Sequence, residues 1–195
     1  EEIMHWLSLL CSIFLASGLW KGVYGELQER LPGLSPQQNQ VYASYKLSTA
    51  NAVLTTIFCV LWWHGVPYIT HIANVSLVAY FIIDLDGLLP YSYWRKHKDQ
   101  LFHHVICICF ISMALLLDGR YLEYCSKYAL VSEVSTIFAN LRWMMLKKFY
   151  RTDPVMFSIN KTLFIVSFLV IRIGLGGINT YNILMDEHVY PIVKF

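Results

Sequence analysis

The sequence predicts an all-α fold, a polytopic transmembrane helical bundle of six helices with room for an incomplete seventh. Of its 195 residues, 56% are hydrophobic and 14% are charged, and the mean hydropathy is +0.48. A soluble domain is nearer ~45–50% apolar and ~25% charged. The hydrophobic residues occur in several blocks along the chain, so we expect one membrane domain over residues 1–195 and no second domain.

Six apolar blocks have the length of roughly 20 residues that a helix needs to cross a bilayer core. Their ends coincide with helix breakers: the linker 31–40 contains two prolines, Pro90 closes the third block, and Asp153-Pro154 opens the sixth. For residues 179–195 the sequence does not indicate whether another span is present. The predicted spans are 4–24, 42–63, 72–92, 100–117, 121–146 and 155–178.

The charges between the blocks predict an orientation, because basic residues near helix ends favour the cytoplasmic side. The positive side is then the cytosol, or the matrix in a mitochondrial protein, and the N-terminus lies opposite. The net charge of +2 is too weak to indicate nucleic acid as a partner. Nine basic residues fall on one side and three on the other: Lys21, Arg30, Lys46, Arg95, Lys96, Lys98, Lys147, Lys148 and Arg151, against Arg120, Lys127 and Lys194.

Several polar residues fall inside the predicted spans, where they are costly and by default mark a site. Acidic side chains are too short to reach the interface as Lys and Arg do. We therefore expect a polar cavity that opens to the basic side, with Arg172 lying apart near the other end of its span. The residues in the half of the bilayer nearer the basic side are Asp84, Asp86, His103, His104, Glu133, Arg142, Asn160 and Lys161.

Helical phase limits which of these side chains can meet. His103 and His104 diverge by about 100° around the helix axis, so only one can point fully into a given pocket. Glu133, Thr136 and Asn140 are three and four residues apart and share one face.

Three interpretations of the histidine pair remain open. A catalytic histidine, as base or nucleophile, needs an orienting carboxylate, and Asp84 or Glu133 could supply it. A metal site would need more ligands at helical spacing than His97 offers, so we expect no metal and no other cofactor. A structural or binding role is favoured from the residues alone, since most buried polar groups are simply hydrogen-bonded.

Several short motifs occur in an order that resembles the TLC family, named for the TRAM, LAG and CLN proteins, over about residues 46–172. The branch it resembles most has uncertain activity. The motifs are Lys46-Leu-Ser-Thr, Ile83-Asp84-Leu85, Phe102-His103-His104, Ser132-Glu133-Val134-Ser135, Asn140-Leu-Arg142-Trp143, Ile159-Asn160 and Val170-Ile-Arg172-Ile173.

The resemblance implies a degenerate catalytic motif. The family's ceramide synthases combine a His-His pair with His-Asp-x-x-Asp on the next helix. Here His103 and His104 keep the pair, but Ser132, Glu133 and Thr136 stand where the histidine and the two aspartates are expected. Acyl transfer needs an oriented base and stabilised charge, so loss of two groups should cripple it. The family also usually has another hydrophobic helix about where this chain stops.

We therefore expect lipid binding or support of membrane lipid homeostasis, without ceramide synthase activity. The lipid would be a phospholipid, a sphingolipid or an acyl chain. The resemblance favours the endoplasmic reticulum, with the mitochondrial inner membrane as the alternative. Two other functions stay open: an accessory subunit of a larger membrane assembly, and an acyl-CoA-dependent acyltransferase that uses His103 or His104. The predicted lipid-binding residues are His103, Asp84, Glu133, Asn140, Arg142, Asn160 and Lys161, with His103, Arg142 and Lys161 at the headgroup.

Overall fold

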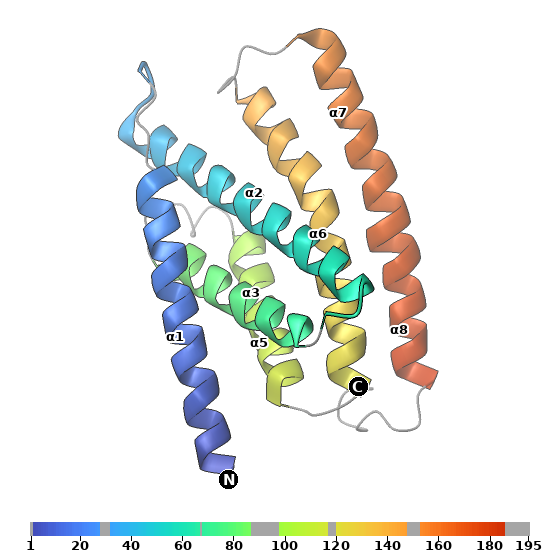
Figure 1. Cartoon of the computed structure of the whole chain (residues 1–195). Coiled ribbons are helices and arrows are strands. Elements are labelled where there is room, and N and C mark those ends of the chain that lie inside the picture. Colours follow the sequence, from blue (N-terminus) through green and yellow to red (C-terminus); the bar gives the residue numbers. More distant parts are fainter. Residues whose placement is uncertain are drawn as a thin grey trace.

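A computed structural model describes residues 2–27, 32–66, 68–86, 98–116, 120–147 and 153–185. Within these ranges the chain forms six helices and no strand, which confirms the predicted all-α class (Figure 1). The sixth helix is continuous from α7 through a π-helical stretch, η1, into α8. The elements are α1 (Glu2–Leu27), α2 (Pro36–Trp63), α3 (Ile69–Asp86), α5 (Lys98–Leu116), α6 (Arg120–Leu146), α7 (Pro154–Ser167), η1 (Phe168–Leu175) and α8 (Gly176–Met185).

Successive helices run in opposite directions. The end of α1 and the start of α2 therefore lie at the same end of the bundle as the end of α6 and the start of α7 (Figure 1). In the orientation predicted from the sequence, the larger group of basic residues falls at this end. We refer to it as the basic end.

The start of α2 differs from the prediction, because the helix begins at Pro36 rather than at residue 42. The Ser35 side chain accepts a hydrogen bond from the Gln38 backbone N–H at 3.2 Å, and the Gln38 side chain accepts one from the Ser35 N–H at 2.8 Å. This capping box satisfies two backbone donors that a helix start leaves free. The proline follows at the first helical position, where it needs no donor.

The last helix also differs, because it continues to Met185 instead of ending at residue 178. The predicted end of the third span beyond residue 86, and the incomplete seventh helix, lie outside the described residues.

Only one helix of the described ranges, Pro154–Met185, is long and apolar enough to cross a membrane by length and composition alone. The sequence predicted six such spans. In α3 and α5 the apolar stretches are shorter, Ile69–Leu85 and Gln100–Leu116. In α2 and α6 polar residues such as Asn51 and Asn140 lower the hydropathy, and these side chains are buried inside the bundle.

The core is centred on α3, which contacts α1, α2, α5 and α6. Its residues from Leu77 to Phe81 are all buried. Trp20 lies near the end of a predicted span, yet its ring is buried against Tyr80 and its Nε1–H donates to the Ser76 carbonyl oxygen at 3.1 Å. An indole buried this way satisfies its single donor, which explains its place in the core.

Candidate functional site

The two adjacent histidines point to different places. His104 lies between two acceptors: its Nε2 is 2.6 Å from Asp84 Oδ2, and its Nδ1 is 2.9 Å from the Gln100 carbonyl oxygen. Ser44 donates to the other Asp84 oxygen at 3.2 Å. Since a carbonyl oxygen can only accept, Nδ1 carries a proton, and a second proton lies between Nε2 and the carboxylate. His104 thus joins α2, α3 and α5 and has no ring nitrogen left to act as a base.

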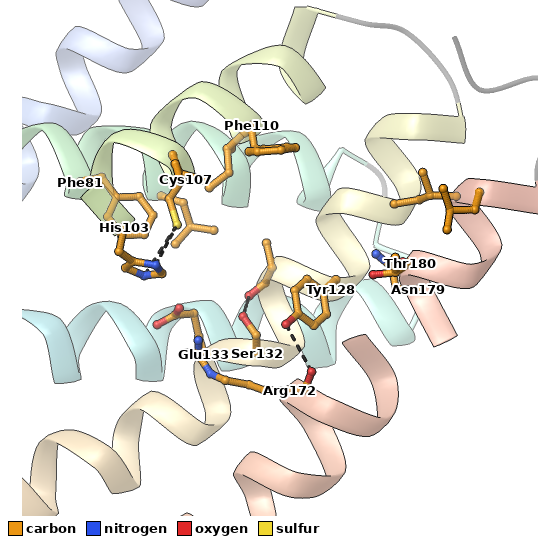
Figure 2. Close-up of a pocket in the computed structure, with 16 residues that line it drawn as sticks. Phe81, His103, Cys107, Phe110, Tyr128, Ser132, Glu133, Arg172, Asn179 and Thr180 are labelled. Carbon is orange, nitrogen blue, oxygen red and sulfur yellow. Dashed lines mark hydrogen bonds between the residues drawn. The ribbon is translucent and has the colours of Figure 1, made fainter. Parts of the chain in front are cut away.

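His103 lies one residue earlier and lines a cavity of about 600 Å³. The walls come from α3, α5, α6 and the continuous helix formed by η1 and α8. Most lining side chains are apolar, such as Phe81 and Phe110, which lie on the same side of the cavity as His103 (Figure 2). The expectation that the two histidines cannot share one pocket is confirmed.

Charged groups meet at one end of this cavity. Arg172 donates from Nε to Ser135 Oγ and from Nη2 to Thr136 Oγ1, both at 2.9 Å. The Glu133 carboxylate points toward the Arg172 guanidinium (Figure 2). Among the described residues, these two side chains do not form an ion pair within 4.0 Å. The His103 ring points toward the Glu133 carboxylate from α5, at the same end of the cavity (Figure 2).

The position of Arg172 differs from the prediction, which set it apart from the other polar residues. The reason is the length of the last helix. With its end at Met185, Arg172 lies near the middle of the 32-residue helix rather than near its end. Glu133 also lies near the middle of the antiparallel helix α6, so the two residues are at the same level.

Arg172 belongs to the π-helical stretch, and this local geometry shapes the site. The Gly176 N–H bonds to the Ile171 and Ile173 carbonyl oxygens. The Arg172 carbonyl oxygen instead faces the Tyr128 hydroxyl at 3.5 Å (Figure 2). Short π-helical segments are frequent at functional sites.

The cavity extends away from the basic end. It reaches Ile183 and Leu184 near the end of α8, which lies at the opposite end of the bundle (Figure 1). The sequence predicted a cavity opening to the basic side. The physical reason is that the last helix continues beyond residue 178 and lines the cavity there, while the charged lining groups stop at the level of Arg172.

The remaining predicted residues lie elsewhere. Asn140 donates to Ser48 Oγ at 2.8 Å and joins α6 to α2, and Asn160 donates to the Phe138 carbonyl oxygen at 3.1 Å and joins α7 to α6. Arg142 is half-buried and Lys161 is exposed. The face shared by Glu133, Thr136 and Asn140 is thus divided between the cavity and α2. Of the predicted lipid-binding residues, only His103 and Glu133 line the cavity.

The site includes residues that sequence reasoning missed. Tyr128 and Cys107 line the cavity, and the Cys107 sulfur lies 3.7 Å from His103 Nε2. The four-residue spacing of His103 and Cys107 on one helix was a usable signal. Within the described ranges no group of three or more His, Cys, Asp or Glu side chains could hold a metal ion.

Comparisons of this chain with known proteins point to the TLC domain. The family model of the TLC domain matches residues 40–194. TLC domain-containing protein 4-B of Xenopus laevis is 28% identical over 76% of this chain and 62% of its own length. TLC domain-containing protein 4 of Homo sapiens is 31% identical over 53% of this chain and 40% of its own. The chain spans about half the length of these relatives. No solved structure matches it.

Proposed function

We propose, from the premise that the chain belongs to the TLC domain family, that it binds a membrane lipid and lacks ceramide synthase activity. The matched relatives are named TLC domain-containing proteins 4 and 4-B, and neither name denotes a ceramide synthase. One observation supports lipid binding most directly: the cavity has largely apolar walls and a single end where Glu133, Arg172 and His103 converge. Ligand sites in proteins have this composition and a volume of about 300–1,000 Å³.

The polarity of the cavity matches the two parts of a lipid. Apolar side chains of α3, α5 and α8 offer a surface for a hydrocarbon chain, which gains about 0.8 kcal/mol per buried CH₂ relative to water. The charged end offers hydrogen-bond donors and acceptors for a headgroup. A lipid would therefore lie with its headgroup near Arg172 and its chain toward Leu184.

The contacts of the degenerate motif favour binding over acyl transfer. Ser132 donates to the Ala129 carbonyl oxygen at 3.0 Å, and Thr136 accepts a hydrogen bond from Arg172. Neither hydroxyl can replace a histidine or an aspartate as a general base near neutral pH. Since His104 is held by Asp84 and Gln100, one histidine remains for chemistry.

Native mass spectrometry of the gently purified protein, with identification of the released lipids, tests the proposal. We expect one lipid for each chain in the wild type and loss of that lipid in R172M and H103A. Lys161→Ala is the matched control, because Lys161 is exposed and outside the cavity. Equal lipid occupancy in wild type, R172M and H103A would refute the proposed site.

The same preparation distinguishes the two alternatives. Turnover of acyl-CoA by the purified chain, lost in H103A, would establish an acyltransferase. A particle much heavier than the 22.7 kDa chain plus detergent would indicate an accessory subunit. The nearly complete exposure of the last helix, with 6% of its apolar window buried, suits contact with either lipid or further subunits.

The resemblance to the TLC family also bears on which membrane holds the protein. We expect the endoplasmic reticulum, with the mitochondrial inner membrane as the alternative. Fluorescence microscopy of the tagged protein against markers of both membranes would decide between them.

A further inference from the structure

We infer that the ligand is a single-chain amphiphile with an uncharged, hydrogen-bonding headgroup, for which a long-chain alcohol is the simplest representative. This inference rests on the proposed lipid binding and narrows it to one chemical class. It depends on three properties of the cavity: its volume, the balance of its charges, and the separation of two of its walls.

The volume limits the size of the ligand. At about 30 Å³ for each non-hydrogen atom, the share of one molecule in liquid water, a cavity of about 600 Å³ holds roughly 20 such atoms. A saturated chain of about 16 carbons with a small headgroup fits this limit. A two-chain lipid carries about twice that number or more, so the cavity cannot enclose both of its chains.

The charge balance limits the headgroup. Of the described residues that line the cavity, one carries a carboxylate, Glu133, and one a guanidinium, Arg172. Their formal charges cancel, and the hydrogen bonds that Arg172 donates to Ser135 and Thr136 go to neutral hydroxyls. A charged headgroup would leave one unbalanced charge in an apolar setting, which is costly. A hydroxyl can donate to Glu133 and accept from Arg172 or His103 without that cost.

The walls indicate how a chain reaches the cavity. Both α5 and α8 line it, yet within the described residues these two helices do not contact each other. Phe110 of α5 is 53% exposed and Leu184 of α8 is 51% exposed, so the cavity meets the outside of the bundle between them. In a membrane, hydrocarbon chains lie outside that gap. A single chain can therefore pass sideways from the bilayer, with its headgroup moving toward Arg172.

A matched set of probes tests the inference. The probes are hexadecanol, palmitic acid, hexadecylamine and dipalmitoylglycerol, which vary the headgroup charge or the number of chains. Each is added to the delipidated full chain in detergent, and binding is measured by native mass spectrometry. We expect hexadecanol to bind one to one, and the two charged probes to bind about tenfold more weakly or worse. Dipalmitoylglycerol should show no one-to-one complex.

Variants that change the charge balance sharpen the test. Glu133→Gln leaves Arg172 unbalanced, so the preference should move from hexadecanol to palmitic acid. Arg172→Met leaves Glu133 unbalanced and should move it to hexadecylamine. Ala129→Phe adds bulk to the cavity wall and should abolish binding, whereas Ile178→Phe adds the same ring at a position that is exposed and outside the cavity.

The outcomes separate this inference from the proposed function. If no lipid of any kind copurifies and no probe binds, lipid binding itself is refuted. If the wild type prefers a charged probe or binds dipalmitoylglycerol one to one, lipid binding stands and the single-chain, uncharged class is overturned. The ranking of the four probes on the wild type decides the matter even where a variant fails to fold.

Discussion

The contact between Gly176 and Tyr128 offers a sharp test of the helix packing beside the cavity. A Cβ atom added at Gly176 would lie 2.9 Å from Tyr128 Cε2, 3.0 Å from its hydroxyl oxygen and 3.1 Å from Cζ. Carbon atoms in contact are normally about 3.5–4.0 Å apart. Gly176→Ala should therefore push the tyrosine ring away from α8.

The cost follows from two opposing effects. Overpacking in a close contact costs about 1–3 kcal/mol, while replacing glycine by alanine within a helix gains about 1 kcal/mol. The hydroxyl contact of Tyr128 with the Arg172 carbonyl oxygen is long, at 3.5 Å, so its loss adds little. Gly177 is the matched control, because a Cβ there meets nothing within 4 Å and only the gain applies.

We expect G176A to be less stable than G177A by about 1–3 kcal/mol, which is the overpacking cost alone, because the gain from replacing glycine by alanine applies to both helical positions. For a chain of this size that difference lowers the unfolding temperature by about 2 °C or more. Thermal unfolding of both variants in the same detergent measures it. In a Y128A background the difference should largely disappear, because all three contacting atoms are removed. Equal unfolding temperatures for G176A and G177A would refute the close contact.

Three further predictions concern stability, each measured by thermal unfolding in detergent. His104→Ala should cost about 3 kcal/mol or more, because it leaves a buried carboxylate without its partner, whereas H103A should cost about 1 kcal/mol or less; a reversed order would contradict the assigned roles. Ser35→Ala should cost about 1 kcal/mol through loss of the capping box, with the exposed neighbour Gln37→Ala as control, and equal effects would argue against the cap. Asn51 is 1% exposed and both its side-chain polar atoms lack a partner within the described residues, so N51L should stabilise the protein by about 1 kcal/mol or more, and a loss of stability would reveal a partner.

The sequence predicted the helices better than their ends. All six helices were expected from runs of apolar residues, because burial and hydrocarbon both favour such runs. The ends depend on local contacts that hydropathy does not report. The capping box at Ser35 is readable from the spacing of Ser35 and Gln38, and it shows that α2 starts inside the expected linker. The continuation past residue 178 crosses Asn179 and Thr180, which look like loop residues but line the cavity.

The candidate site was predicted in part, for a reason that follows from geometry. Helical phase separated His103 from His104, since the angle between neighbouring residues is fixed by the helix itself. The level of Arg172 depended on where its helix ends, and an error of seven residues in that end moved it by about 10 Å along the axis. The partner of His104 could not be chosen from sequence, because both Asp84 and Glu133 lie at suitable depths. In the structure the partner is Asp84, whose Oδ2 lies 2.6 Å from His104 Nε2.

The division between the two histidines explains how an adjacent pair can serve a single cavity. His104 is fixed by Asp84 and by Gln100 on its own helix, so α5 is held against α3 at that level. The next residue back along the helix must then turn by about 100°, which directs His103 toward Glu133 and Arg172. The contacts that fix His104 therefore also place His103 in the cavity wall, where it faces the ligand. Removing His104 should disturb the cavity through the position of α5, whereas removing His103 should change only what the cavity binds.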